Sequence, residues 1–81
     1  MEVGYVLFNI EPAAKKSFMA KIRKIKAVKD VHLVIGIFDA IARIEAESIN
    51  DLEKVYLNEI DNIPGIMNSR LHLVACPRTR K

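Results

Sequence analysis

Several features that mark particular classes of protein are scarce or absent in this chain of 81 residues. A single cysteine, Cys76, excludes an internal disulfide and agrees with a reducing, cytoplasmic compartment. No apolar run approaches the ~20 residues that a membrane-spanning helix needs, and the first residues lack the basic and apolar regions of a signal peptide. We therefore expect a soluble cytoplasmic protein without a membrane partner.

The sequence also lacks the patterns by which cofactor sites and catalytic sites are usually recognised. It has no glycine-rich phosphate loop, no paired carboxylates, and no cluster of cysteine or histidine at metal-ligand spacing. His32 and His72 fall on different expected strands, which favours surface or interface roles, and Cys76 has no evident base beside it. We expect no cofactor, no metal and no catalytic residue.

Tryptophan and glutamine are missing too, whereas lysine, glutamate and isoleucine are plentiful, a composition typical of thermophilic sources. Hydrophobic residues make up 51% of the chain, which favours a folded domain over disorder. A domain of this size buries only about 60% of the surface that its unfolded chain exposes. Because neither a disulfide nor a metal strengthens so small a core, we expect a homo-oligomer.

The net charge of +3 is unevenly distributed along the chain. Residues 15–29 contain seven basic residues and no acidic one, and a second basic cluster closes the chain over residues 77–81. We interpret these clusters as a solvated helix face and a terminal tail. Binding of nucleic acid or of another anionic partner is the alternative, although no aromatic stacking pair accompanies the charges.

Apolar periodicity predicts the order strand, helix, strand, strand, helix, strand. The strands are expected over residues 3–10, 28–35, 39–46 and 66–75. The first helix should begin at Glu11 and Pro12, since proline is tolerated in the first turn. Ser48 is a candidate cap for the second helix, which Pro64 and Gly65 end.

This order predicts an α+β, ferredoxin-like βαββαβ fold over residues 1–76, with a four-stranded antiparallel sheet and both helices on one face. The other face of the sheet would then be uncovered. The sequence offers too many apolar strand residues for a wet face, among them Val6, Phe8, Ile10, Leu71 and Leu73. Because an open apolar face marks an interface, we expect dimerisation through it.

Gly36-Ile37-Phe38-Asp39 forms a corner between the two middle strands. Glycine can take a positive φ at such a corner, and the aspartate can accept hydrogen bonds from nearby amides. These residues could serve as a turn alone, with Phe38 as a packing residue. The corner is the best candidate for a place where a small polar ligand meets the backbone.

With this corner, two further segments make the chain resemble the effector-binding domain, or RAM domain, of the Lrp/AsnC family of transcriptional regulators. They are Val28-x-x-Val31 before the corner and Ile63-Pro64-Gly65-Ile66-x-x-Ser69 around the start of the last strand. The family normally carries an amino-terminal helix-turn-helix domain, for which the residues before the first strand leave no room. The resemblance thus implies a stand-alone form of the module, without direct sequence-specific DNA binding.

The resemblance also implies a homodimer that assembles into higher oligomers, with a small amino acid bound between dimers. By position, the ligand-binding residues would include the corner, namely Gly36, Ile37, Phe38 and Asp39. Two hydroxyls of the last strand often complete the family's pocket. The first of these positions falls on Ser69, and the second on Leu71, which has no hydrogen-bonding group. Asp39 could pair with the ammonium of the ligand, and amides near Gly36 with its carboxylate.

We therefore expect a ligand-binding and oligomerisation module rather than an enzyme, one that modulates transcriptional regulators and has a full-length Lrp/AsnC-type regulator as a further partner. Two alternatives stay open. A cofactor-independent, ferredoxin-like dimeric oxygenase or isomerase would use His32 or His72 as its base, in a cavity between helices and sheet. An ACT-like amino-acid sensor shares the element order but pairs its sheets side by side.

Overall fold

The computed structural model describes residues 1–75, and it has the expected α+β architecture. The strands are β1 (Glu2–Ile10), β2 (Val28–Leu33), β3 (Ala40–Ala46) and β4 (Ile66–Leu73). The helices are α1 (Lys15–Ile22) and α2 (Ile49–Val55). A 3-10 turn over Pro12–Ala14 precedes α1, and a π-helical turn over Tyr56–Ile60 extends α2. Cys76 and the expected basic tail over residues 77–81 lie outside the described residues.

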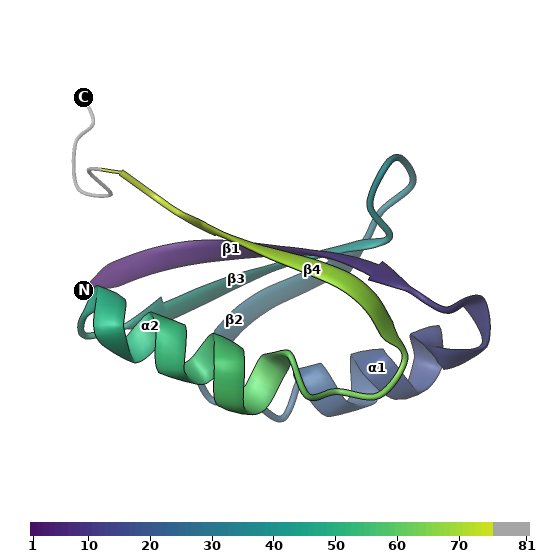
Figure 1. Ribbon diagram of the computed structural model, residues 1–81, viewed down its shortest axis with the longest axis horizontal. Coiled ribbons are helices and arrows are strands. Elements are labelled where there is room, and N and C mark those ends of the chain that lie inside the picture. Colours follow the sequence, from purple (N-terminus) through teal and green to yellow (C-terminus); the bar gives the residue numbers. More distant parts are fainter. Residues whose placement is uncertain (76–81) are drawn as a thin grey trace.

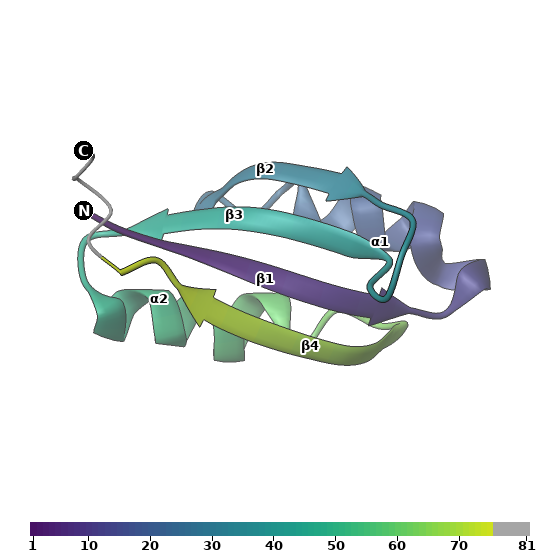
Figure 2. The same ribbon diagram turned by 90° about the horizontal axis from the view of Figure 1, so that it is seen from above.

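The strands form one antiparallel sheet in the order β2-β3-β1-β4, so β1 has a partner on both sides and β2 and β4 are the edges. Both helices cover the same face of this sheet (Figure 1). Seen from above, α1 lies toward the β2 edge and α2 toward the β4 edge (Figure 2). The order of elements and the strand order confirm the ferredoxin-like fold.

The core lies between the helices and the sheet. Successive side chains of a strand point to opposite faces, so every second residue of β1 and β3 reaches the helices. The buried core consists of Val6, Phe8, Ile10, Phe18, Ile22, Ala40, Ala42, Ile44, Leu52, Ile60 and Ile63. Phe8 and Phe18 meet edge to face with ring centroids 4.9 Å apart, which fastens the last part of β1 to α1.

The prediction that Val6, Phe8 and Ile10 make the uncovered face apolar is wrong. All three are buried on the helix-covered face, and Leu71 packs against the same core. Leu73 pairs with the buried Gly4, on the helix side of the sheet, and is 44% exposed. Because β1 is apolar on both faces, its alternation alone cannot tell which set of residues the helices cover.

The uncovered face carries the other set of residues. Val3, Tyr5 and Leu7 of β1 lie there, and their partners across the ladder are charged or apolar residues of β3, among them Arg43 and Ile41. This face, which we call the open face, therefore mixes apolar side chains with charged ones. It still holds an apolar strip along the central strand.

The two middle strands are shorter at the corner than predicted. β2 ends at Leu33 instead of residue 35, and β3 begins at Ala40 instead of residue 39. Residues 34–39 form a loop that is closed by a hydrogen bond of 2.9 Å from the Val34 N–H to the Asp39 carbonyl. β4 likewise ends at Leu73 instead of residue 75. The Val74 N–H still donates to the Val3 carbonyl at 2.9 Å, so a single hydrogen bond continues beyond the end of β4 as one does at the corner.

The ends of the helices are set by local hydrogen bonds. Ser48 caps α2 as predicted, since its hydroxyl accepts the Asp51 N–H at 3.1 Å. α1 begins later than predicted because the 3-10 turn at Pro12 comes first. In the π turn, the Asp61 N–H donates to the Tyr56 carbonyl at 2.8 Å. None of the helices in residues 1–75 combines the length and the apolar character that crossing a membrane would require.

Gly65 allows the start of β4 to pack closely on the segment before α1. Its φ is +94°, a value that side-chain-bearing residues rarely adopt. A Cβ atom built there would lie 2.3 Å from the Cβ of Ala14. The Gly65 carbonyl also accepts the Glu11 N–H at 2.9 Å, so the two segments cannot separate without losing a hydrogen bond. Gly65 is therefore required for this contact, whereas the helical segment before it already ends at Ile60, earlier than predicted.

Replacing Gly65 by alanine should lower the free energy of unfolding by about 2 kcal/mol or more, because the change adds both backbone strain and a steric overlap. Urea unfolding at a fixed protein concentration measures this. Gly36→Ala is the matched control, since Gly36 also has a positive φ but a Cβ atom there meets nothing within 4 Å, so this variant carries the backbone strain without the steric overlap. Equal losses for the two variants would contradict the packing role of Gly65.

Candidate functional site

The corner projects from the sheet on the side opposite the helices (Figure 1). Its tip is apolar and exposed, with relative accessibilities of 106% for Ile35 and 88% for Ile37. Gly36 lies between them with a φ of 157°, a value that residues with a side chain rarely adopt. No atom lies within 4 Å of a Cβ atom built at Gly36, so space around the tip does not require a glycine there.

Three hydrogen bonds fasten the base of the corner to the end of β1. The Asp39 N–H donates to the Phe8 carbonyl at 2.7 Å. The side-chain amide of Asn9 donates to the Ile37 carbonyl at 2.8 Å. The Ile10 N–H donates to Oδ2 of Asp39, also at 2.8 Å. The tip is thus exposed while its base is held in one position.

Asp39 has a structural partner and retains capacity for another. Its Oδ2 is taken by the backbone of β1, and its Oδ1 lies 3.9 Å from Nζ of Lys15 in α1. The two side chains are 31% and 41% exposed, so water reaches the pair. A carboxylate offers about four acceptor positions, so Asp39 could still accept from an incoming ammonium. Phe38 beside it is half-buried.

Ser69 lies in β4 and belongs to a chain of hydrogen bonds beneath α2. Its hydroxyl donates to Oδ1 of Asp61 at 2.8 Å and lies 2.6 Å from the Tyr56 hydroxyl. Since a carboxylate only accepts, the Ser69 proton goes to Asp61, and Tyr56 must be the donor to Ser69. The π turn brings the two partners to the same hydroxyl, because it separates Tyr56 from Asp61 by one wide turn. The Ser69 hydroxyl therefore already makes two hydrogen bonds to side chains of its own protomer.

Leu71 faces the helix-covered side of the sheet. It pairs with Val6 across the β1–β4 ladder, and it is half-buried against the core. The position that would carry a second hydroxyl is thus a packing position in this chain.

The corner and Ser69 lie on opposite sides of β1. Phe8 pairs with Ala40 on one side and with Ser69 on the other, so two strand spacings, about 10 Å, separate the two backbones. A single protomer holds the predicted residues in two groups, one formed by Gly36, Ile37, Phe38 and Asp39 and the other by Ser69 and Leu71.

Sequence reasoning missed the residues that hold these groups in place. Asn9 could have been noticed, because it interrupts an otherwise apolar strand. Tyr56 lies in the second expected helix, where a tyrosine is as readily a packing residue as a hydrogen-bonding one. Asp61 and Lys15 gave no signal, because their contacts depend on the π turn and on the position of α1 beside the corner.

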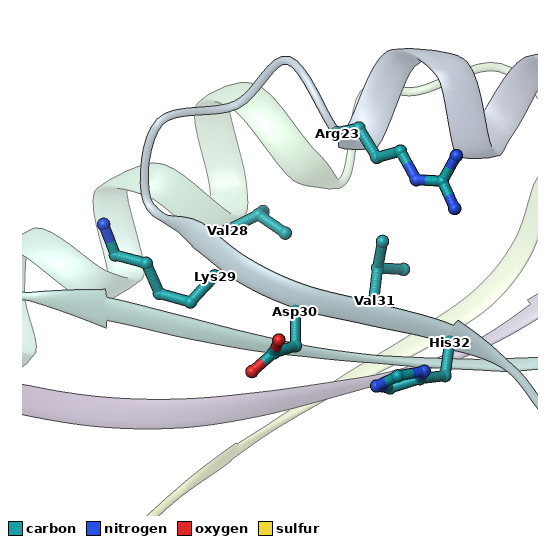
Figure 3. Close-up of a pocket in the computed structure, with 6 residues that line it drawn as sticks. All are labelled: Arg23, Val28, Lys29, Asp30, Val31 and His32. Atoms are coloured by element: carbon teal, nitrogen blue, oxygen red, sulfur yellow. The ribbon is translucent and has the colours of Figure 1, made fainter.

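Four hollows on the surface of residues 1–75 are lined by residues other than the predicted site residues. One lies at the β2 edge, where Arg23 and Val31 lie on the α1 side of the strand while Asp30 and His32 point to the other side (Figure 3).

Within residues 1–75, no group of three or more acidic, histidine or cysteine side chains is placed to hold a metal ion.

The open face carries a charged cluster around Arg43. Its Nε and Nη2 atoms donate to Oδ2 of Asp30 at 2.9 and 2.8 Å, and Nη1 pairs with Glu45. The hydrogen bonds to Asp30 raise the pKa of Arg43 above its ordinary value, so the guanidinium stays charged. His32 and His72 are both exposed, and His72 lies opposite Tyr5 across the β1–β4 ladder.

The chain also matches known proteins. A family model described as the Lrp/AsnC ligand binding domain matches residues 4–76. A proline dehydrogenase transcriptional activator of Rhizobium radiobacter is 28% identical over 68 residues, a match that covers 84% of this chain and 44% of that protein. The chain thus spans less than half the length of this curated relative.

Solved structures share the fold at lower identity. A protein of Thermus thermophilus superposes with a TM-score of 0.90 at 20% identity, over 99% of this chain and 100% of that one. AsnC of Escherichia coli gives 0.85 at 21% identity, over 99% and 55%. A transcriptional regulator of Neisseria meningitidis, solved in complex with L-methionine, gives 0.85 at 16% identity, over 98% and 53%. At these identities the likeness establishes the fold alone.

The role of Asp39 at the base of the corner predicts a stability effect that does not involve a ligand. Asp39→Ala leaves the Ile10 N–H without its acceptor and should lower the free energy of unfolding by about 1 kcal/mol. Asp39→Asn keeps a side-chain oxygen at the same place and should lose less. Chemical denaturation of the two variants measures the difference, and an Asn variant as unstable as the Ala variant would contradict this role.

Proposed function

Because the chain belongs to the Lrp/AsnC ligand-binding domain family, we propose that it is an effector-binding and oligomerisation module that binds a small amino acid between dimers and modulates transcriptional regulators. Its curated relative is itself a transcriptional activator. A full-length Lrp/AsnC-type regulator is the partner that this role implies.

The observation that carries the proposal is the corner. Its base is fixed by three hydrogen bonds to β1, and its tip is exposed. A fixed backbone with an accessible carboxylate suits a ligand that has both an ammonium and a carboxylate, since each end can meet a complementary group. In the proposed site Asp39 pairs with the ammonium and the backbone amides near Gly36 meet the carboxylate.

A neighbouring dimer would complete this site. In one protomer the corner is open to solvent and Ser69 lies across β1 from it. One copy alone would therefore leave most of a bound ligand exposed to water. The exposed side chains of Ile35 and Ile37 at the tip favour a ligand with an apolar side chain, whereas Leu71 packs against the core of its own protomer. The complex of the Neisseria meningitidis regulator with L-methionine is in keeping with such a ligand.

Dimerisation is proposed to occur through the open face. Two sheets that pack face to face lie about 10 Å apart and bury the side chains between them. Tyr5 and Leu7 of the central strand, together with Ile41, would form the apolar middle of that contact. The Arg43–Asp30 pair has its hydrogen bonds satisfied within one protomer, so its burial costs less than that of an unpaired charge.

The alternative of an oxygenase or isomerase is less well supported. Both histidines that could serve as a base are exposed. The space between helices and sheet is occupied by fully buried side chains such as Phe8, Phe18 and Ile22. The family match also favours the Lrp/AsnC module over an ACT-like sensor.

Titration calorimetry of the protein against each of the twenty amino acids tests the ligand. We expect at least one to bind, and Asp39→Asn to weaken its affinity by about tenfold or more, because the variant loses the charge but keeps the contact to Ile10. Asp51→Asn, at an exposed carboxylate on α2, is the control and should bind normally. Binding of none of the twenty, or equal affinity for both variants, would refute the assigned site.

A second experiment tests the dimer. Leu7→Glu places a charge in the middle of the proposed contact and should raise the dimer dissociation constant by at least about tenfold, as sedimentation over a range of concentrations can measure. Leu57→Glu makes the same change on the helix side of the protein, where Leu57 is 59% exposed. This control should leave the dimer intact. A Leu7 variant that dimerises like the unaltered protein would rule out the open face.

A further inference from the structure

Charge is separated between the two helical segments. Residues 15–29 carry seven basic side chains and no acidic one, whereas residues 47–61 carry five carboxylates against one lysine, a formal charge of −4. α1 lies toward the β2 edge of the sheet and α2 toward the β4 edge (Figure 2). The α1 side of the protein is therefore a basic flank and the α2 side an acidic flank.

The basic flank contains a hollow between α1 and the end of β2. Its lining is mostly apolar and is supplied by Lys15, Lys16, Met19, Ala20, Arg23 and Leu33. Leu33 is 49% exposed there, and the Arg23 side chain extends along the α1 side of β2 (Figure 3). This basic hollow combines an apolar surface with three cations.

The acidic flank offers the complementary combination. Ile49, Glu53 and Leu57 follow one another at intervals of four residues along α2 and into the π turn, so they line up on one side of the helix. Ile49 is 48% exposed and Leu57 is 59% exposed. We call these three residues the acidic stripe, in which a carboxylate stands between two exposed apolar side chains.

Several charges of the basic hollow and the acidic stripe have no partner of opposite charge within the protomer. Among residues 1–75 the ion pairs involve Lys15 with Asp39, and Arg43 with Asp30 and Glu45, so Lys16, Arg23 and Glu53 have no ion-pair partner there. Lys26 and Lys29 differ from them. They share a separate hollow with Glu45, Glu47 and Glu59, where opposite charges already lie close together.

We propose that the acidic stripe of one copy docks into the basic hollow of the next copy, with Leu57 against the apolar lining and Glu53 facing Lys16 and Arg23. This inference rests on the proposed function, since it names the contact through which dimers assemble further. The two surfaces are different and lie on opposite flanks, so the contact is head to tail. Such a contact forms a closed ring when the rotation that relates one copy to the next is a whole fraction of a full turn. It leaves the open face free for the dimer.

Exchanging the charges tests this contact. The variant Lys16→Glu/Arg23→Glu replaces two of the three cations of the basic hollow by carboxylates, and Asn50→Lys/Glu53→Lys places two lysines on α2 at the acidic stripe. Each variant alone should stay dimeric and lose higher assembly, with at least about tenfold weaker association of dimers. An equimolar mixture of the two should regain the assembly, because the altered hollow of one variant then meets the altered stripe of the other with opposite charge. Light scattering coupled to size exclusion measures the masses.

The matched control is Lys26→Glu/Lys29→Glu, which changes the charge by the same amount outside the basic hollow and should keep the assembly. The assembly of the unaltered protein should also weaken when salt rises from about 0.1 M to about 1 M, since the Debye length falls from about 10 Å to about 3 Å. Failure of the mixture to assemble would overturn the inference. An unaltered protein whose mass does not exceed that of a dimer would overturn it as well, but would leave the proposed open-face dimer unaffected. A monomeric protein whose charge-exchanged variants associate on mixing would instead refute the open-face dimer and support the head-to-tail contact.

Discussion

The last three residues of β1 are the element on which the rest of the structure depends. Phe8 and Ile10 fill the core beneath the helices, and Phe8 also meets Phe18 of α1. The backbone and side chains of the same segment hold the corner, through the Phe8 carbonyl, the Asn9 amide and the Ile10 N–H. A change that shifts β1 in its register would therefore disturb the core and the candidate ligand site together.

The one-sided cover of the sheet has a direct functional consequence. Both helices pack on one face, so the other face is left without helices, and the corner rises on that same side (Figure 1). A module of this shape can use one surface for dimerisation and keep its loops and flanks for ligands and neighbours. Assembly and effector binding can then influence each other, because each stabilises the arrangement that the other requires.

The sequence predicted the fold well because its apolar periods, Ser48 and the Pro64–Gly65 pair are local signals. It could not predict which face of β1 is covered, since both sets of alternating residues are apolar. The corner was located from its glycine and aspartate, but the bond from Asp39 to Ile10 joins residues 29 apart in sequence and needs the β1–β3 register. The hydrogen bonds of Ser69 to Tyr56 and Asp61 could not be predicted, because they depend on a π turn that no sequence pattern indicates.

The central claim is that effector binding and assembly are coupled in this module. The mass of the protein in solution, measured with and without a mixture of the twenty amino acids, tests the claim most directly. The account predicts a dimer or a multiple of dimers whose mass distribution shifts when the mixture is added. A protein that remains monomeric, or whose mass is the same with and without amino acids at every concentration, would contradict it.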